Sequence, residues 1–163
     1  MVNLTQKERM LLEDQKSHEE LCIKKYNDYA NKAQDPQLKQ LCTSLGQHEQ
    51  QHLDTINSIL SGQVPNMNQQ QQGQQNQQQN QQNMQNMQNQ SASGSGMPNA
   101  SDAYLCNDLL ATEKYVSGTY DTTIFECTQK DIRNVLNHIQ KEEQEHGESI
   151  FNYMQSHGMY NPQ

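Results

Sequence analysis

The sequence contains two copies of the pattern Glu-x-x-His, a spacing that suits metal binding. Residues three apart lie on one face of a helix, so each copy can offer a carboxylate and an imidazole to the same ion. A further glutamate stands 30 residues before each copy, which completes the set Glu19, Glu49, His52, Glu113, Glu143 and His146. One glutamate from each of two helices, with Glu-x-x-His from each of two others, is the donor set of a dinuclear iron or manganese site.

The two halves of the chain repeat one another at a fixed offset of 94 residues. Leu11 falls on Leu105 and Tyr26 on Tyr120, and an internal repeat is the simplest account. Because duplication copies every residue type, the second half of the donor set is not independent evidence. Three interpretations stay open: a working metal site, a scaffold that has kept its ligands without using them, and a solvent-facing coincidence.

Apolar residues recur at helical spacing on both sides of a glutamine-rich segment and predict two helical hairpins. The first hairpin covers residues 4–61, and its boundary signals are the capping box Thr5/Glu8, the turn at Asp35-Pro36 and the stop at Gly62. The repeat places the second hairpin at residues 101–160, with helices from about Asp102 to Cys127 and from about Gln129 to Ser156, followed by Gly158.

The segment 62–100 carries no charged residue, and 22 of the 28 residues from Gln63 to Gln90 are Gln or Asn. Such a tract lacks the apolar area that offsets chain entropy, so we expect a disordered linker. Its role stays open between a neutral spacer and an assembly or cross-linking segment. A flexible linker of this length averages roughly 31–37 Å end to end, close to the ~39 Å length of the predicted helices.

Each hairpin alone would leave an apolar stripe in water, so we expect the two hairpins to bury their stripes against each other. Tight turns within each hairpin and a long crossover between them predict an all-α, ferritin-like four-helix bundle. A disordered crossover equally permits two chains to exchange hairpins, so a homo-oligomer or a hairpin-swapped dimer is an alternative.

The glutamates of the donor set interrupt the apolar stripes of their helices. Four buried carboxylates would repel one another, whereas two divalent cations would neutralise them. Oxygen ligands with two imidazoles suit two Fe or two Mn ions and leave Zn open. Tyr26 and Tyr120 lie two turns beyond Glu19 and Glu113 on the same faces. We interpret both tyrosines either as core residues or as groups that hydrogen-bond the ligands or donate electrons.

Composition excludes several classes of protein. With 11 Lys+Arg against 19 Asp+Glu and a pI near 5.1, the chain lacks the basic surface that nucleic acid requires. No apolar run approaches the ~18 residues of a membrane span, and residues 1–10 lack the apolar core of a signal peptide, so we expect a cytosolic product. We interpret the four widely spaced cysteines as small core residues, and the remaining histidines as surface residues: His18, His48, His138 and His157.

Three stretches of the second half follow a known pattern: Asp108 to Tyr115 with Tyr120, Asp131 to Leu136, and Phe151 to Tyr160. In order and spacing they resemble the Coat F domain of spore coat proteins from endospore-forming Firmicutes, which belong to the ferritin-like group. The resemblance covers most of the second hairpin, is weaker in the first hairpin and excludes the linker. The sequence departs from the family at Met159, where an aromatic residue is typical.

The resemblance implies a structural protein that is made in the mother-cell cytoplasm and deposited in the spore coat beside other coat proteins. It does not imply catalysis. The donor set suggests a competing function, a di-iron or di-manganese oxidoreductase of the catalase, peroxidase or ferroxidase type. The two functions are compatible, and whether the chain is an enzyme stays open.

Overall fold

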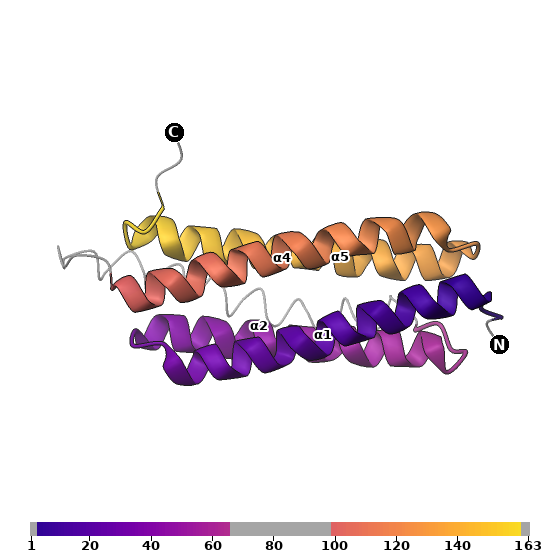
Figure 1. Cartoon of the computed structure of the whole chain (residues 1–163), viewed down its shortest axis with the longest axis horizontal. Coiled ribbons are helices and arrows are strands. Elements are labelled where there is room, and N and C mark those ends of the chain that lie inside the picture. The colour runs from indigo at the N-terminus through magenta and orange to yellow at the C-terminus, as the bar shows by residue number, and fades with distance from the viewer. Residues whose placement is uncertain (1–2, 66–98, 161–163) are drawn as a thin grey trace. The chain divides into compact units, whose positions relative to one another are not determined.

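A computed structural model of the chain describes residues 3–65 and 99–160 (Figure 1). Over these ranges the chain is helical without strands, and its helices are α1 (Gln6–Lys32), α2 (Pro36–Leu60), α4 (Ala100–Glu126) and α5 (Lys130–Ser156). The helices belong to one compact unit, in which α1 packs mainly on α2 and α4 mainly on α5. This confirms the predicted all-α bundle of two hairpins. Most of the predicted linker 62–100 lies outside the described residues, so its disorder stays a prediction.

The duplication is visible in the helix bounds. α4 begins and ends 94 residues after α1, and α5 begins 94 residues after α2. α4 starts at Ala100, two residues before the predicted Asp102, because Asn99 accepts hydrogen bonds from the backbone N–H groups of Ser101 and Asp102. Asn99 occupies the position equivalent to Thr5, the N-cap of α1. The helix start therefore follows the repeat.

The other residues that were predicted to start or end helices do so in the structure. Thr5 and Glu8 form a capping box, and the Asp35 carboxylate accepts a hydrogen bond from the backbone of Gln37 at the start of α2. Gly62 and Gly158 follow α2 and α5 with φ angles of 90° and 67°. Only glycine adopts this left-handed backbone without strain, so both helices end in a Schellman turn.

The direction of the helices follows from contacts between the hairpins. Lys25 pairs with Asp108 at 2.8 Å, and Gln15 donates a hydrogen bond to Thr123 at 2.9 Å. Residue numbers fall along α1 as they rise along α4, so these two helices are antiparallel. Since each hairpin is also antiparallel, α2 and α4 run in the same direction (Figure 1). The end of α2 and the start of α4 therefore lie at opposite ends of the bundle.

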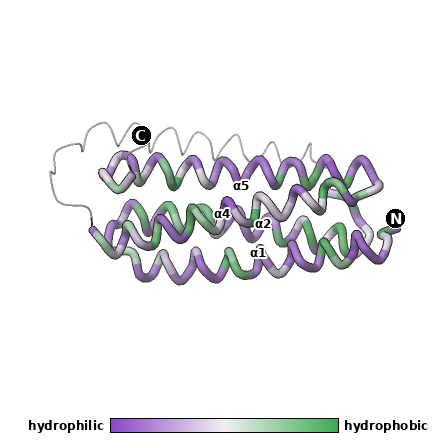
Figure 2. The backbone as a smooth tube through the Cα atoms, turned by 45° about the horizontal axis from the view of Figure 1, so that its top comes forward, coloured by the Kyte–Doolittle hydropathy of each residue, from purple (hydrophilic) through white to green (hydrophobic). Residues whose placement is uncertain are grey.

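The interior is apolar on either side of a polar middle, and Figure 2 shows apolar and hydrophilic positions alternating along every helix. A core cluster fills the end near the α1–α2 turn and includes Tyr26, Leu38, Cys42, Leu45, Leu105, Leu109, Ile150 and Met154. At the other end the buried residues include Leu12, Ile56, Ile59, Ile124, Ile132 and Leu136. None of the described helices has the length and apolar composition of a membrane span.

All four cysteines are free and buried. Burial raises the pKa of Cys42 and Cys106 to about 12 and that of Cys127 to about 11. For Cys22, burial and the neighbouring glutamates raise the pKa of the thiol well above its usual range. The thiols therefore stay protonated, which suits their interpretation as small core residues.

A duplicated carboxylate ties each helix start to the opposite interhelical turn. Glu8 is fully buried and accepts hydrogen bonds from the backbone N–H (2.7 Å) and hydroxyl (2.9 Å) of Thr128. Its equivalent, Asp102, accepts hydrogen bonds from the backbone N–H groups of Gln34 and Asp35, both at 2.9 Å. Each hairpin thus holds the turn of the other, which fixes the register of the bundle.

We expect Glu8→Gln to lower the free energy of unfolding at pH 7 by about 2 kcal/mol, because a charged acceptor is replaced by a neutral one. Although burial opposes it, hydrogen bonding lowers the pKa of Glu8 from 4.5 to about 2. The folded-state pKa is the lower one, so this stabilisation is present above pH 4.5 and disappears as the pH falls towards 2. Urea unfolding between pH 3 and 7 measures it. Exposed Glu13→Gln is the control, and a Glu8→Gln effect that does not shrink with falling pH contradicts this account.

Candidate metal centre

The six predicted donors meet at the middle of the bundle. Glu19 lies on α1, Glu113 on α4, and the two Glu-x-x-His pairs lie on α2 and α5. Each glutamate stands near the midpoint of its helix, so the antiparallel arrangement brings all four to one level. All six side chains are buried, with no more than 3% of any residue exposed. The solvent-facing interpretation of these residues is therefore wrong.

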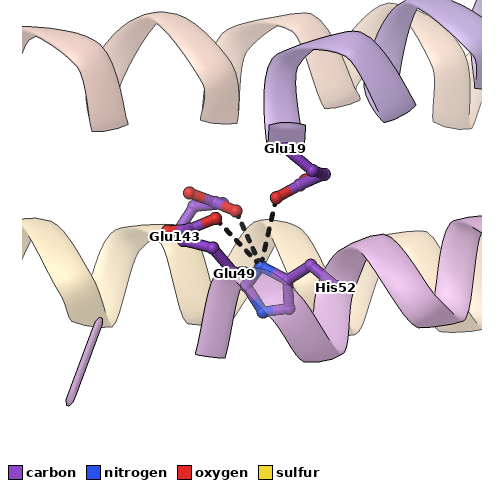
Figure 3. A group of neighbouring side chains, drawn as sticks. All are labelled: Glu19, Glu49, His52 and Glu143. Carbon is purple, nitrogen blue, oxygen red and sulfur yellow. Dashed lines mark hydrogen bonds and ion pairs between the residues drawn. The ribbon is translucent and has the colours of Figure 1, made fainter. Parts of the chain in front are cut away.

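The donors form two overlapping groups, within each of which one ligand atom from every residue lies within 4.8 Å of the others. The first group is Glu19, Glu49, His52 and Glu143 (Figure 3), and the second is Glu49, Glu113, Glu143 and His146. Both groups share Glu49 and Glu143. Two adjacent cation positions with two bridging carboxylates would use the set in full.

Each histidine turns its Nδ1 atom towards the carboxylates. Nδ1 of His52 lies 3.0 Å from Glu143 Oε1, 3.5 Å from Glu49 Oε2 and 3.7 Å from Glu19 Oε2 (Figure 3). Nδ1 of His146 lies 2.9 Å from Glu49 Oε1 and 3.7 Å from Glu113 Oε2. The two rings are stacked, with centroids 5.5 Å apart. The Nδ1 atoms are therefore the ones placed to bind metal.

Four carboxylate oxygens in this cluster test whether the residues fit metal ions. Oε2 of each of the four glutamates is buried and accepts no hydrogen bond within the described part of the chain: Glu19, Glu49, Glu113 and Glu143. The nearest imidazole nitrogens, at 3.5–3.7 Å, are too distant to donate to three of these oxygens. Buried carboxylate oxygens without donors are costly. Divalent cations would satisfy them, so the residues present fit a dinuclear site.

The charges of the cluster respond strongly to burial. Burial raises the pKa of Glu19 to about 7, and burial with the nearby charge of Glu49 raises the pKa of Glu143 well above its usual range. Burial acts the same way on Glu49, but the hydrogen bond from His146 and the nearby charges of His146 and His52 outweigh it and lower the pKa of Glu49.

The histidines carry the balancing charge. Burial disfavours their protonated forms, yet neighbouring carboxylates raise the pKa of His146 to about 10 and that of His52 well above its usual range. Protons on the histidines and on two of the glutamates therefore balance the buried negative charge when metal is absent. Metal ions would displace them.

Comparison with known protein families finds a match for the second hairpin, which holds three of the six donors. Residues 101–163 match the family model of the Coat F domain. This match confirms the resemblance to the Coat F domain that the sequence indicated, and it covers the second hairpin from its second residue onward. The second hairpin supplies Glu113, Glu143 and His146. Comparison with curated proteins and with solved structures finds no match.

The two tyrosines singled out in the sequence link the second hairpin to the first. The hydroxyl group of Tyr120 donates a hydrogen bond to Glu19 Oε1, and that of Tyr26 donates one to Glu113 Oε1. Both residues are buried, and each reaches the glutamate of the other hairpin. Each tyrosine is therefore both a core residue and a hydrogen-bond partner of a predicted ligand.

Two residues next to the donor histidines were missed as functional candidates, one on each hairpin. Glu142 Oε2 lies 3.1 Å from Nε2 of His52, and Nδ1 of His48 lies 3.3 Å from Nε2 of His146. His48 was interpreted as a surface residue, but it is half-buried and its ring stacks on that of His146. The other three histidines are also half-buried: His18, His138 and His157. Their lack of a histidine mate in the repeat was the misleading signal.

Proposed function

We propose that the chain is a structural component of the spore coat, made in the mother-cell cytoplasm and deposited beside other coat proteins. The Coat F domain in residues 101–163 carries this proposal. The helices of the first hairpin match those of the second in length and spacing to within two residues. We therefore regard the two hairpins together as a single structural unit of the coat.

We further propose that two Fe or two Mn ions hold the bundle together at its middle. The four buried Oε2 atoms that accept no hydrogen bond support this proposal. Bound ions would neutralise the carboxylates of all four helices and so join the hairpins. No donor residue is more than 3% exposed, so bulk water has little access to the site, and we favour a structural role over turnover.

The alternative is a di-iron or di-manganese oxidoreductase of the catalase, peroxidase or ferroxidase type. The hydrogen bonds from Tyr26 and Tyr120 to Glu113 and Glu19 favour it, because a phenol in contact with a metal ligand can supply an electron. The metal ions would provide the redox chemistry. The chain would supply the ligands, the two phenols and a site shielded from bulk water.

The test is the metal content of the untagged full-length protein, produced in medium supplemented with iron and manganese. Inductively coupled plasma mass spectrometry is expected to find about two Fe or Mn ions per chain, as the two donor groups require. The control is the Glu49→Gln/Glu143→Gln double variant, which keeps side-chain size and removes both bridging carboxylates. Equal metal content in the two proteins contradicts the proposed site.

The same double variant separates the structural role from the enzymatic one. In a spore-forming host we expect it to enter the coat in reduced amounts, measured by mass spectrometry of the coat, because it lacks the ions that join the two hairpins. Purified wild-type protein with its metal should not consume hydrogen peroxide faster than the free ions. Rapid peroxide consumption that the double variant lacks, together with normal incorporation of that variant into the coat, supports the oxidoreductase instead.

A further inference from the structure

The two halves of the metal centre differ at one pair of equivalent positions. His48 on α2 corresponds to Glu142 on α5 in the 94-residue repeat. Each side chain lies beside the outer nitrogen, Nε2, of the donor histidine that the other hairpin provides. One donor histidine thus faces a carboxylate, and the other faces an imidazole.

The donors and the tyrosines of the two halves are matched. Every donor has a donor of the same type in the other half, and Tyr26 is matched by Tyr120. The hydrogen bonds of the two tyrosines are matched as well, each to the glutamate of the opposite hairpin. The difference between His48 and Glu142 lies at the donor histidines themselves, so it can make two similar cation positions unequal.

A carboxylate and an imidazole affect a metal-bound histidine differently. A carboxylate that accepts the outer N–H fixes the tautomer with Nδ1 free for the metal and strengthens that nitrogen as a donor. A neutral imidazole is a weaker acceptor, and it can also donate, so it fixes the tautomer less firmly. His52 has the stronger arrangement, because Nε2 lies 3.1 Å from Glu142.

The surroundings keep both contacts in place. The Glu142 side chain is only 16% exposed, and Nε2 of His138 lies 3.5 Å from its Oε1 atom, one turn earlier on the same helix. The ring of His48 stacks on that of His146 with centroids 5.4 Å apart and planes 25° apart. Neither contact depends on a fully exposed side chain.

We propose that Glu142 and His48 are positioning residues that make the two metal sites unequal, so that the His52 group fills before the His146 group. This inference rests on the proposed dinuclear site. Loss of an outer partner of a metal-bound histidine commonly weakens metal binding by about 10–100-fold. We therefore expect the two binding steps to differ by about that factor.

Calorimetric and visible-absorption titrations of the full-length protein with Co(II) test the inference. Wild-type protein should bind two ions in steps that differ about 10–100-fold in affinity. Glu142→Gln should weaken the tighter step by about the same factor and leave the weaker step nearly unchanged. Glu148→Gln, an exposed change on the same helix, is the matched control.

Two further variants assign the steps to the groups. A His146→Gln chain keeps His52 and should bind its first Co(II) about 10–100-fold more tightly than a His52→Gln chain, and adding Glu142→Gln should remove that advantage. His48→Glu places a carboxylate beside His146 and should tighten the weaker step. A merely structural role of position 48 or 142 would not produce this gain.

The outcomes separate this inference from the proposed function. Two equal steps in the wild-type protein, or a Glu142→Gln effect spread equally over both, overturn the inequality and leave the metal site in place. No uptake of Co(II) by the wild-type protein overturns the dinuclear site, and the inequality with it.

Discussion

Manganese(II), or iron(II) without oxygen, is expected to raise the melting temperature of the full-length protein by on the order of 10–20 °C. The ions would satisfy four buried carboxylate oxygens that accept no hydrogen bond, one on each helix of the bundle. An ion present at 100 times its dissociation constant stabilises the folded state by about 2.7 kcal/mol, so two ions contribute about 5 kcal/mol. Far-UV circular dichroism on heating, with metal and with a chelator, measures the shift.

The Glu49→Gln/Glu143→Gln double variant is the control for this stabilisation. It lacks both carboxylates shared by the two donor groups, so metal should shift its melting temperature by no more than about 2 °C. A shift as large as in the wild-type protein would mean that the ions bind elsewhere, for instance to exposed acidic residues. An unchanged wild-type melting temperature would remove metal from the account of stability.

The helix ends that the sequence predicted correctly depend on local chemistry. Thr5 with Glu8 and Asp35 with Pro36 act within one helical turn, so their effect does not require knowledge of the fold. The start of α4 was placed two residues late, because Asn99 follows a Gln/Asn-rich tract and looked like part of it. Its position 94 residues after Thr5 was the signal that could have identified it as an N-cap.

The donor set was predictable for a related reason. Spacing along one helix and distance from a tight turn place Glu19 and Glu49 at the same level, and duplication supplies the rest. Contacts between the hairpins were not predictable in this way. Glu142 beside His52 depends on how α5 packs laterally against α2, and a half-buried residue at such a boundary leaves no periodic signal. Single-sequence patterns therefore found the ligands and missed their outer partners.

The two glutamates that both donor groups share, Glu49 and Glu143, are expected to differ in the metal-free protein. Glu49→Gln should lower the free energy of unfolding at pH 7 by about 3 kcal/mol, because it leaves two buried protonated histidines without their shared carboxylate. Glu49 reaches both, with Oε1 2.9 Å from His146 Nδ1 and Oε2 3.5 Å from His52 Nδ1. Burial opposes ionisation, but the hydrogen bond from His146 and the charges of both histidines outweigh burial and keep the pKa of Glu49 low, so Glu49 is ionised at pH 7.

Glu143→Gln should change the same free energy by less than about 1 kcal/mol. Burial and the charge of Glu49 raise the pKa of Glu143 well above its usual range, which favours the protonated side chain, and an amide resembles that form. Urea unfolding in the presence of a chelator measures both variants, and equal losses of stability would contradict the assigned charges. Both variants should nevertheless lose metal, since a bound cation requires both carboxylates to be ionised. A position that matters little for the metal-free fold and greatly for metal binding is what distinguishes a ligand from a core residue.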